Sequence, residues 1–544
     1  MKKIIAGALG ECVHVAGISN FLRIAEEAGW QTLFLGPAVP IDEIIKVANQ
    51  EQAEIVGVSY RLTPETGENL LAEFAEQADE LRQKGVRFLF GGTPEVAKRA
   101  DSLGFFEKVF SGEESDSDVL AYLKNVITNE KPDEVFPSSF CDRAKWKAPF
   151  PLIRHHFGLP TIKDTQDGIK RIALARVLDV ISLGLDQDAQ ENFFHPERQK
   201  ISRKGAGGVP VRSADEFVSL FENSRTGNFP LLRSYSGTDD FIAMAEMLTE
   251  TIQNTWCAIP LFWFNKMDGR GPWNLEDSIR QHQNVMKWYG ERNIPVELNE
   301  PHHWGMRDAP DVIFVVAGYL SAYNAKYFGV KDYIAQFMFN SPPGHNDAMD
   351  LAKMQAILEI IQPLESESFK IWKQTRTGLL SYPTHLVKAR AHLASSIYLQ
   401  MALKPDIVHV VGHTEAFHAA TADDVIEACQ MAQRVIETCI KGMPDYGNDA
   451  VIKKRVKFLV SQARILLNSI SQLGDQMGEN DSLSNPVVLA KAVLVGLLDA
   501  PQLMNNAFAR GLIKTRVING ACEVVNESGN YIDEEERIGK LILE

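Results

Sequence analysis

Short apolar runs alternate with helical patterns over the first hundred residues of the chain. Two stretches, 21–27 and 41–50, have the periodicity of amphipathic helices. Four apolar runs have the length and composition of buried strands, at residues 3–9, 32–35, 55–59 and 86–90. Strands that alternate with helices form parallel sheets, whose ligands bind beyond the carboxyl ends of the strands. The pattern predicts an α/β, doubly wound, flavodoxin-like domain over residues 1–128.

The same alternation resumes later and continues over a much longer stretch. Long amphipathic helices are predicted at 239–254 and 275–292. Six further runs have the character of buried strands, at residues 172–177, 231–235, 259–264, 295–298, 333–339 and 406–411. This rhythm predicts a (β/α)8 TIM-type barrel over residues 166–514, with six of its eight strands assigned.

Two other segments lack this rhythm. Residues 129–165 contain repeated Pro, Ser and aromatic residues, which indicates a linker that wraps a surface rather than a free tether. Residues 515–544 predict a C-terminal β-hairpin and tail, with a loop longer than a two-residue turn. The charged stretch 533–537 predicts the start of a solvated helix.

Length and composition fit a large enzyme with two hydrophobic cores. The chain has 544 residues, of which 45% are hydrophobic and 23% charged, and its net charge is −15. Affinity for phosphate backbones comes from clustered Lys and Arg, which this sequence does not have, so we expect no nucleic-acid partner. We find no transmembrane segment in the sequence and expect no membrane partner. The six cysteines form no Cys-x-x-Cys pair, which favours the reducing cytoplasm over a disulfide framework.

Residues that can bind a metal or a ligand follow three of the predicted N-terminal strands. His14 and Gly17 follow the first strand, and Gly91 and Gly92 follow the fourth. Ser59, Leu62 and Thr63 form the third loop. An imidazole nitrogen can bind a transition metal, and glycines allow a bulky ligand to approach the backbone closely.

This trio of loops resembles the vitamin B12-binding domain, which carries Asp-x-His-x-x-Gly, Ser-x-Leu and Gly-Gly signatures. The resemblance implies a cobalamin cofactor whose cobalt is bound by His14 in place of the cofactor's own dimethylbenzimidazole. The displaced tail would lie in a channel lined by the serine loop and the glycine pair. The cofactor-binding residues implied in this way are His14, Gly17, Ser59, Leu62, Thr63, Gly91 and Gly92.

Two positions depart from the family pattern. Cys12 stands where the family has aspartate, and Arg61 where leucine is usual. The aspartate would orient the imidazole and raise its basicity, a role for which neighbouring Glu11 is the alternative. The other interpretation is an ordinary flavodoxin-like domain in which His14 is a loop histidine.

Polar residues also gather at the predicted strand ends of the barrel, where active sites of this fold lie. The collection comprises Arg176, Arg233, Tyr235, Asn265, Glu300, His302, His303, Asn340, His345, His409 and His413. Such a set suits a small polar substrate. The alternative is that several of these side chains cap helices or satisfy buried backbone groups.

The barrel resembles two cobalamin enzymes over part of its length. Residues 230–240 are similar to the Arg-x-Gly-Thr segment with which the glutamate mutase epsilon subunit holds a substrate carboxylate, which implies that role for Arg233. Residues 412–418 resemble a segment of the lysine 5,6-aminomutase alpha subunit. Ile259 lies near the position of the glutamate that meets the substrate amino group in glutamate mutase, so glutamate is not the expected substrate. Pyridoxal phosphate is not expected. In the aminomutases a lysine of the corrinoid subunit, on a segment ahead of the cobalt loop, holds it, and this chain begins too close to His14 to supply that segment.

Together these features predict an adenosylcobalamin-dependent mutase that carries out a radical 1,2-rearrangement of a small carboxylate or amino acid. Arg176 and Arg233 would bind a carboxylate. Glu300, His302 and His345 would donate hydrogen bonds or transfer protons, and Tyr235 and Asn265 complete the predicted catalytic set. We expect a homo-oligomer, a dimer, with a second subunit as a further possibility.

Three alternatives remain open at this stage. A corrinoid methyltransferase would share the cobalt domain, but it usually adds a helical cap, and none precedes His14 in this sequence. A non-catalytic corrinoid carrier or light sensor would need no barrel with polar strand ends. His409, His413 and His418 could also form a metal site, although their spacing has no regular ligand pattern.

Overall fold

The computed structural model describes residues 2–112, 114, 116, 119–120, 122–123, 136–235 and 237–543. The chain divides into two compact units, Met1–Val135 and Phe136–Glu544. In the described part of the chain, no helix has the length and apolar character needed to cross a membrane. Each unit is built around its own parallel sheet.

The N-terminal unit is a five-stranded parallel sheet with strand order β2-β1-β3-β4-β5, the order of a flavodoxin-like fold. Its strands are β1 (Lys3–Leu9), β2 (Gln31–Val39), β3 (Ile55–Tyr60), β4 (Arg87–Gly92) and β5 (Lys108–Phe110). The helices described in this unit include α1 (Ala16–Glu27), α2 (Ile41–Gln50), α3 (Pro64–Gln83) and α4 (Pro94–Ser102). The predicted α/β fold class is confirmed for this unit.

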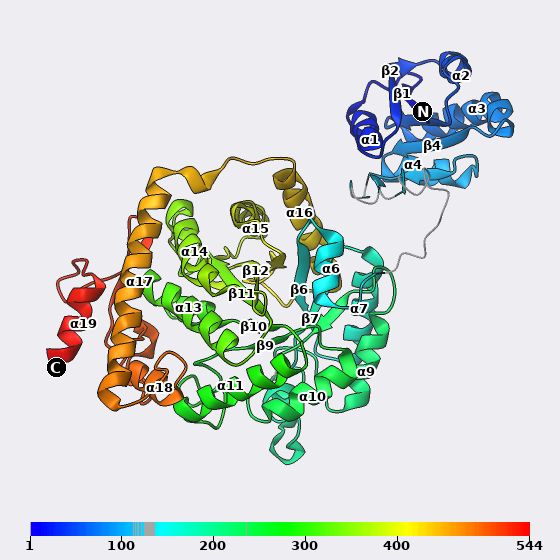
Figure 1. Ribbon diagram of the computed structural model, residues 1–544. Helices are drawn as coiled ribbons and strands as arrows, with labels where there is room; N and C mark the ends of the chain where they lie inside the picture. The colour runs from blue at the N-terminus through cyan, green and yellow to red at the C-terminus, as the bar shows by residue number, and fades with distance from the viewer. Residues whose placement is uncertain are drawn as a thin grey trace. The chain divides into compact units, whose positions relative to one another are not determined.

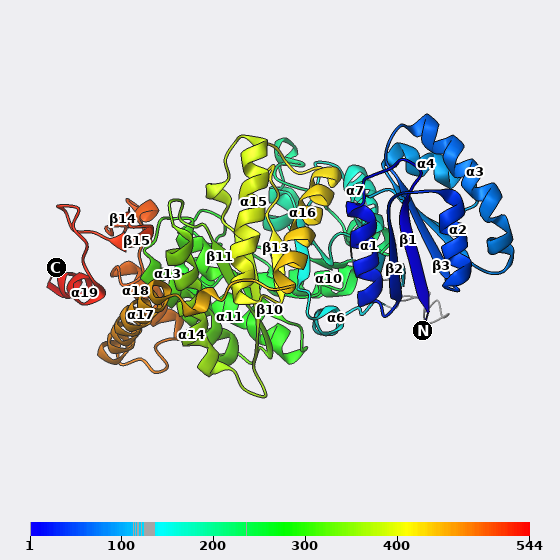
Figure 2. The same ribbon diagram turned by 90° about the horizontal axis from the view of Figure 1, so that it is seen from above.

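Helices cover both faces of this sheet. On one face, Leu22 of α1 packs with Ile4 and Leu89 of the strands. On the other, Phe74 of α3 packs with Phe88 of β4, and α2 and α4 join the same cluster. Figure 2 shows α1 on one side of the strands and α2 and α3 on the other. Because both faces are buried, a ligand has access at the edge where the strands end.

The second unit is a nearly closed barrel of eight parallel strands in the order β8-β7-β6-β13-β12-β11-β10-β9. The bounds are β6 (Leu152–Phe157), β7 (Val180–Leu183), β8 (Leu231–Arg233), β9 (Cys257–Ile259), β10 (Val296–Leu298), β11 (Asp332–Phe339), β12 (Lys370–Thr377) and β13 (Ile407–Val410). A parallel bridge between Tyr235 and Ala258 joins the β8 side to the β9 side. The predicted TIM-type barrel is therefore confirmed.

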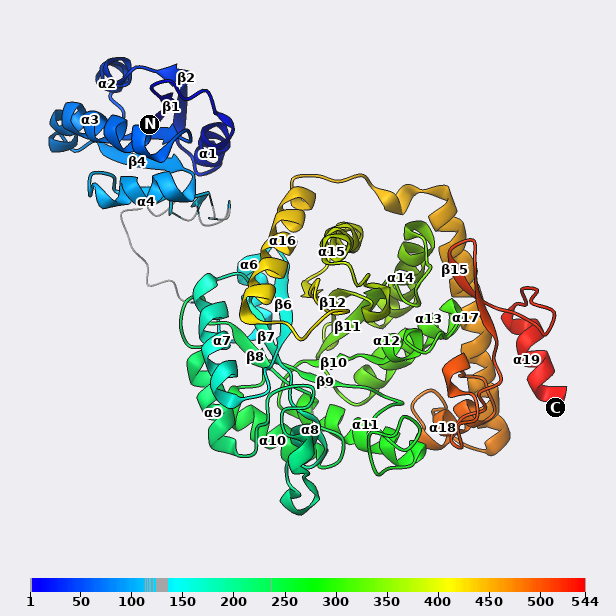
Figure 3. The same ribbon diagram turned by 180° about the vertical axis from the view of Figure 1, so that it is seen from behind.

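Helices surround the strands of the barrel in Figures 1 and 3. Those that follow the strands or precede the first one are α6 (Phe140–Lys147), α7 (Ile162–Ala175), α8 (Gln187–Glu191), α9 (Ala214–Asn223), α10 (Phe241–Ile252), α11 (Leu275–Glu291), α12 (Glu300–Gly305), α13 (Asp311–Tyr327), α14 (Asp347–Ile361), α15 (Leu386–Gln400) and α16 (Ala422–Ile440). The C-terminal part adds α17 (Ala450–Met477), α18 (Pro486–Leu494), the hairpin β14 (Thr515–Ile518) and β15 (Ala521–Val524), and α19 (Glu534–Leu543). Long α17 packs along α13 and α14.

The structure corrects the strand predicted at 172–177. Residues 172–175 are instead the last turn of α7, which begins after the Thr161 cap and buries Ile169, Ile172 and Ala173 on one face, and Arg176 is its C-cap. That spacing of three and one residues is typical of a helix. The short apolar run in the sequence is therefore compatible with either a strand or a helix. The first barrel strand is β6 instead, which lies within the segment 129–165 predicted as a linker.

The C-terminal segment contains two tight reversals. Asn519 and Gly520 form a two-residue connection between β14 and β15, with φ of 50° and 81°, as a type I′ turn requires. The longer loop predicted from the sequence lies between Val525 and Tyr531, which form an antiparallel bridge, so this loop is confirmed. The helix start at 533–537 is confirmed as α19, but Glu534 and Arg537 are buried, so it is only partly solvated.

The amino-terminal end of the barrel is filled by apolar side chains. Leu152, Val180, Leu231, Ile334 and Ile407 from five strands form one buried cluster with two tryptophans. Phe140 of α6 belongs to the same cluster, and its ring centroid lies 5.2 Å from that of Trp256 and 5.0 Å from that of Trp372. Helix α6 therefore closes this end of the barrel.

We predict that Phe140→Ala lowers the free energy of unfolding of the barrel by about 3–5 kcal/mol, because the truncation leaves a cavity between two tryptophans. All of the chain's tryptophans except Trp30 lie in Phe136–Glu544, so tryptophan fluorescence during urea denaturation reports on this unit. The control Phe417→Ala removes a ring that is 62% exposed and should change stability by less than about 0.5 kcal/mol. Equal effects of the two substitutions would contradict the role of Phe140.

Candidate functional site

The predicted corrinoid loops of the N-terminal unit meet at one edge of its sheet. His14 is exposed in the loop between β1 and α1, and Gly17 lies in the first turn of α1. A Cβ atom added at Gly17 would meet no other atom within 4 Å. Ser59 pairs with Ala8 of β1 and with Gly91 of β4. The register thus places the serine loop and the glycine pair side by side.

This edge has features that fit a bound ligand. The hydroxyl oxygen of Ser59 is buried and has no hydrogen-bond partner among the described residues. A Cβ atom at Gly91 would also meet nothing within 4 Å, so the backbone there faces open space. Buried hydroxyls are normally hydrogen-bonded, and an unpaired one indicates a partner that binds from outside the chain. The residues present therefore fit the nucleotide tail of a cobalamin.

The other residues of these loops have structural as well as binding roles. Gly92 is required by packing, since a Cβ atom there would lie 2.8 Å from the Tyr60 carbonyl oxygen. Thr63 is the N-cap residue of α3, and its hydroxyl donates to that of Thr66 at 2.8 Å. Leu62 is 38% exposed at the same edge of the sheet, where an apolar side chain can contact a corrin ring.

The position of the family's aspartate is occupied here by a core residue. Cys12 is completely buried in the apolar cluster beneath the loop. Glu11 is exposed. Within the described ranges, neither residue forms a hydrogen bond or ion pair with His14. A cobalt bound by His14 would therefore lack the carboxylate that usually orients the imidazole.

A buried polar layer crosses the interior of the barrel, and Glu297 of β10 is at its centre. Glu297 Oε2 accepts hydrogen bonds from Arg154 Nη1 at 2.9 Å, Arg233 Nη2 at 3.1 Å and Trp256 Nε1 at 2.8 Å. Its Oε1 accepts one from Gln336 Nε2 at 3.1 Å. Burial by itself raises the pKa of Glu297, but attraction to the two arginines outweighs it and lowers the pKa to about 2. Glu297 is an anion at all ordinary pH values.

Arg233 keeps donors that no described residue uses. Its side chain is fully buried, and both Nε and Nη1 are without a hydrogen-bond partner among the described residues. Its guanidinium carbon lies 4.6 Å from the ring centroid of Tyr235, which holds it by a cation–π contact. Since an unpaired buried donor costs stability, Arg233 is poised for an acceptor from a ligand.

Arg154 of β6 is the second cation of this layer, and its donors are used within the protein. Its Nε donates to Ser182 Oγ at 2.6 Å, and its Nη1 donates to Gln374 Oε1 at 2.6 Å as well as to Glu297. The Nη2 atom lies 3.3 Å from His156 Nε2. Arg154 therefore positions neighbouring side chains rather than offering free donors.

Arg376 of β12 and several histidines complete the layer. Arg376 is 5% exposed, and its one side-chain hydrogen bond among the described residues goes from Nε to the Thr377 carbonyl at 3.5 Å. His302 bonds through Nδ1 to Gln336. Burial, reinforced by the charge of Arg376 at His302 and of Arg154 at His409, holds the pKa of both imidazoles well below the usual range. These histidines are neutral and can either donate or accept hydrogen bonds.

The structure brings together only part of the predicted catalytic set. Arg233, Tyr235 and His302 belong to the buried layer, directly or through Gln336. Arg176 does not, because it is the exposed C-cap residue of α7 with φ of 56°, not the end of a strand. Its predicted position at a strand end is wrong, because the apolar run before it belongs to helix α7 and not to a strand.

The side chains of Asn265 and Glu300 form hydrogen bonds with the backbone of the loop that follows β9. Asn265 Nδ2 donates to the Phe262 carbonyl at 2.9 Å and to Ser278 Oγ, and its Oδ1 accepts from Met267 N. Glu300 Oε2 accepts from the amides of Leu261 and Phe262 at 2.6 and 3.0 Å. Burial raises the pKa of Glu300 to about 7, against these hydrogen bonds, which lower it. Both side chains hold the backbone of this loop.

His345 belongs to a different buried network. Its Nε2 lies 2.7 Å from Asp311 Oδ1, and Asp311 also pairs with Arg455 of α17 at 2.9 Å. Arg455 in turn pairs with Glu523 of the C-terminal hairpin at 2.5 Å. Lys353 joins the network through His345 Nε2, at 3.2 Å, and Asp311 Oδ1, at 3.6 Å. This network ties α17 and the hairpin to the barrel, so His345 has a structural set of partners.

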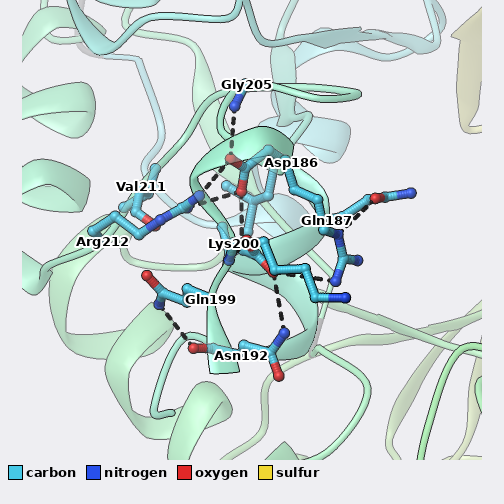
Figure 4. A network of polar contacts seen from close by, with 12 residues as sticks. Asp186, Gln187, Asn192, Gln199, Lys200, Gly205, Val211 and Arg212 are labelled. Atoms are coloured by element: carbon cyan, nitrogen blue, oxygen red, sulfur yellow. Dashed lines mark hydrogen bonds and ion pairs between the residues drawn. The ribbon is translucent and has the colours of Figure 1, made fainter. Parts of the chain in front are cut away.

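The long connection between β7 and α9 is held rigidly by a carboxylate. Asp186 accepts two hydrogen bonds from Arg212, at 2.8 and 2.6 Å, and backbone bonds from Ala189 and Gly205. Figure 4 shows these contacts together with those of Lys200 and Asn192 in the same loop. Loops after strands carry the active sites of this fold, and this one is pre-organised.

One group of described residues has ligand atoms close enough together for a metal ion. These are His195, Asp239 and Asp240, whose ligand atoms lie within 4.8 Å of one another. His195 already pairs with Asp240 at 2.9 Å and Arg198 with Asp239 at 3.6 Å, so internal partners account for their charges. His409, His413 and His418 do not form such a group in the described ranges.

Sequence reasoning missed the centre of the polar layer. Arg154 lies on a strand taken for part of a linker, and Arg376 and Gln374 lie on β12, which was not predicted. In both strands consecutive polar residues interrupt the apolar run, as in Leu152-Ile-Arg-His-His-Phe157. Such runs are a weaker signal than the continuous apolar runs expected of parallel strands.

Comparison with known protein families supports the predicted cobalamin binding by the N-terminal unit. Residues 2–120 match the B12 binding domain family. A novel cobalamin-binding protein from Desulfitobacterium hafniense DCB-2 is 23% identical with a TM-score of 0.21, and the match covers 23% of this chain and 58% of that one. A Rubisco-like protein from Rhodopseudomonas palustris is 10% identical with a TM-score of 0.31, covering 61% of this chain and 79% of that one. No curated protein matches the chain. The match of residues 2–120 supports cobalamin binding, and the two structural likenesses are too slight to add to it.

We predict that His14→Ala weakens cobalamin binding and shifts the visible spectrum of the bound cofactor, because the imidazole is then lost from cobalt. Titration of the full chain with cobalamin, followed by absorption, measures both effects. His418→Ala, which removes an exposed histidine of the barrel unit, is the matched control and should leave spectrum and affinity unchanged. An unaltered spectrum in His14→Ala would mean that cobalt has no ligand from this residue.

A second prediction concerns Glu300, whose pKa in the folded protein is raised to about 7 from an ordinary 4.5. Between these values the folded chain keeps a proton that the unfolded chain has released, so a rise in pH favours unfolding. The stabilisation is complete below pH 4.5 and is lost as the pH rises through 7, by roughly 3 kcal/mol in total. Glu300→Gln should lack this component when urea denaturation is compared across the range. Exposed Glu359→Gln should follow the wild-type profile, and a parallel profile for Glu300→Gln would refute the assignment.

Proposed function

We propose that this protein is an adenosylcobalamin-dependent mutase that rearranges a small carboxylate bound inside the barrel. The observation that carries the proposal is Arg233, a fully buried cation with unpaired donors, in a chain whose residues 2–120 match the B12 binding domain. A non-catalytic corrinoid carrier would have no use for such a cation. Assembly as a homodimer and a place in the cytoplasm stay predictions from the sequence.

The barrel residues have distinct parts in this proposal. Arg233 binds the substrate carboxylate through donors that Glu297 leaves unused. Glu297 and Tyr235 fix the guanidinium in place, which removes the entropic cost of ordering it when substrate binds. His302, neutral and bonded to Gln336, presents a ring nitrogen without adding charge. Fixed dipoles and charges of this kind stabilise a migrating group.

The N-terminal unit would hold the cofactor through His14 at the metal and Ser59 and Gly91 along the nucleotide tail. Adenosylcobalamin, when bound, supplies a carbon radical by homolysis of its cobalt–carbon bond. The substrate gives up one hydrogen atom, a group moves to the adjacent carbon, and one hydrogen atom returns. Substrate and product are isomers, so the reaction needs no external oxidant or reductant.

We predict a cobalt-coupled paramagnetic signal when the full chain is frozen anaerobically with adenosylcobalamin and its substrate, because homolysis creates two unpaired electrons. A panel of amino acids and short branched or hydroxylated carboxylic acids serves as substrate, and paramagnetic resonance is the measurement. Arg233→Lys keeps the charge but loses the planar guanidinium, so turnover should fall about tenfold or more. Exposed Arg171→Lys on α7, which pairs with Asp423, is the control and should turn over normally.

Two results would contradict this function. Activity with methylcobalamin and none with the adenosyl form would identify methyl transfer, which proceeds by two-electron steps and gives no coupled signal. Wild-type turnover in Arg233→Lys would remove Arg233 from the substrate site.

A further inference from the structure

We infer that the substrate of the barrel is a dicarboxylate that carries no ammonium group. The inference rests on the barrel being the substrate site proposed above. It goes further by naming the charge of the ligand and the number of its anionic ends. Three features of the polar layer support it: its surplus of positive charge, the absence of a free carboxylate for an ammonium group among the described residues, and the strands that carry the arginines.

The layer has more buried positive than negative charge. Arg154 and Arg233 are fully buried and Arg376 is 5% exposed, whereas Glu297 is the buried carboxylate that faces them. Glu415, an exposed residue, also attracts Arg376, but burial of its carboxyl raises its pKa, so its charge is disfavoured there. Buried charge is costly unless it is compensated, and three buried arginines share Glu297 as the one fully buried carboxylate of the described layer. A ligand with two negative charges supplies this compensation.

No described carboxylate of the layer is free for a substrate ammonium group. Both oxygens of Glu297 are occupied, by two arginines, an indole and an amide. Burial and neighbouring arginines hold the pKa of His302 and His409 well below the usual range, so these imidazoles are neutral and supply no negative charge. An ammonium group placed here would lie among arginines with no described carboxylate of the layer free to pair with it. Arg270, whose charge also lowers the pKa of His302, is already paired with Asp268 at 2.5 Å.

The two arginines with donors to spare lie on opposite walls of the barrel. Arg233 is on β8 and Arg376 is on β12, and four steps separate these strands in either direction around the eight-stranded order. β12 and the neighbouring β13 also carry polar atoms without a partner among the described residues, Gln374 Nε2 and His409 Nδ1. Cations on opposite walls favour an anionic group at each end of a ligand over a single phosphate. Carboxylates are the planar anions that guanidinium groups match.

Calorimetric titration of the full chain with glutarate, succinate, butyrate, L-glutamate and inorganic phosphate tests this inference. We expect glutarate or succinate to bind about tenfold or more tightly than butyrate, since a second charged hydrogen bond is gained. L-glutamate and phosphate should bind about tenfold or more weakly than the better dicarboxylate, because of the unpaired ammonium and the single anionic centre. Equal binding of butyrate, tighter binding of L-glutamate, or phosphate as the best ligand would each overturn the inference.

Arg376→Met is the decisive variant. Its guanidinium makes one long hydrogen bond to its neighbour's backbone, so its removal leaves no buried carboxylate unpaired and folding is preserved. The variant should lose about tenfold or more in dicarboxylate affinity and keep butyrate affinity within about twofold, because Arg233 still binds one carboxylate. Exposed Arg171→Lys is the matched control and should bind all five ligands like the wild type. Unchanged dicarboxylate binding in Arg376→Met would overturn the two-ended site.

The titration separates this inference from the proposed reaction, because it measures binding without turnover. Dicarboxylate binding without a cobalt-coupled signal would reject the mutase and keep the substrate class. A coupled signal with an amino acid, together with no dicarboxylate binding, would reject the substrate class and keep the mutase.

Discussion

Glu297 accepts hydrogen bonds from side chains of β6, β8 and β11 and from Trp256, the residue before β9. Without it, Arg154 and Arg233 would be buried cations with no counterion, at a cost of several kcal/mol. With it, both guanidinium groups are fixed, and one of them still has donors to offer. The barrel can therefore keep a cationic interior and remain folded, and the rest of the candidate site depends on that balance.

Many of the buried residues around this ion cluster stabilise the barrel and its loops and do not offer groups to a ligand. Phe140 and the apolar layer close one end of the barrel, and Asp186 fixes the loop after β7. Asn265 and Glu300 hold the backbone after β9, and His345 helps to anchor the C-terminal hairpin. These residues are polar, buried and close to strand ends, yet their partners are within the protein. A polar residue at a strand end thus becomes a candidate for ligand binding only when its hydrogen-bonding groups are left over.

The same criterion applies to the N-terminal unit. Ser59 has an unpaired buried hydroxyl beside the open backbone of Gly91, which is what a ligand at the sheet edge would use. Cys12 faces the core and cannot replace the aspartate of the family pattern. Without that partner, we expect His14 to form a less strongly oriented bond to cobalt than a carboxylate-paired histidine gives.

The sequence by itself determined the features that are local. The N-terminal sheet, the barrel class and the corrinoid loops follow from apolar runs and from motifs placed directly after strands, where neighbours in the chain are neighbours in space. β6 and β12 escaped prediction because their inward positions are polar, and 172–177 was misassigned because a short apolar run fits a strand or a helix. Only the closed barrel decided that Arg154 meets Glu297, 143 residues away. Pairing of charges depends on the tertiary structure, and it determines which predicted residues keep unpaired hydrogen-bonding groups that a ligand can use.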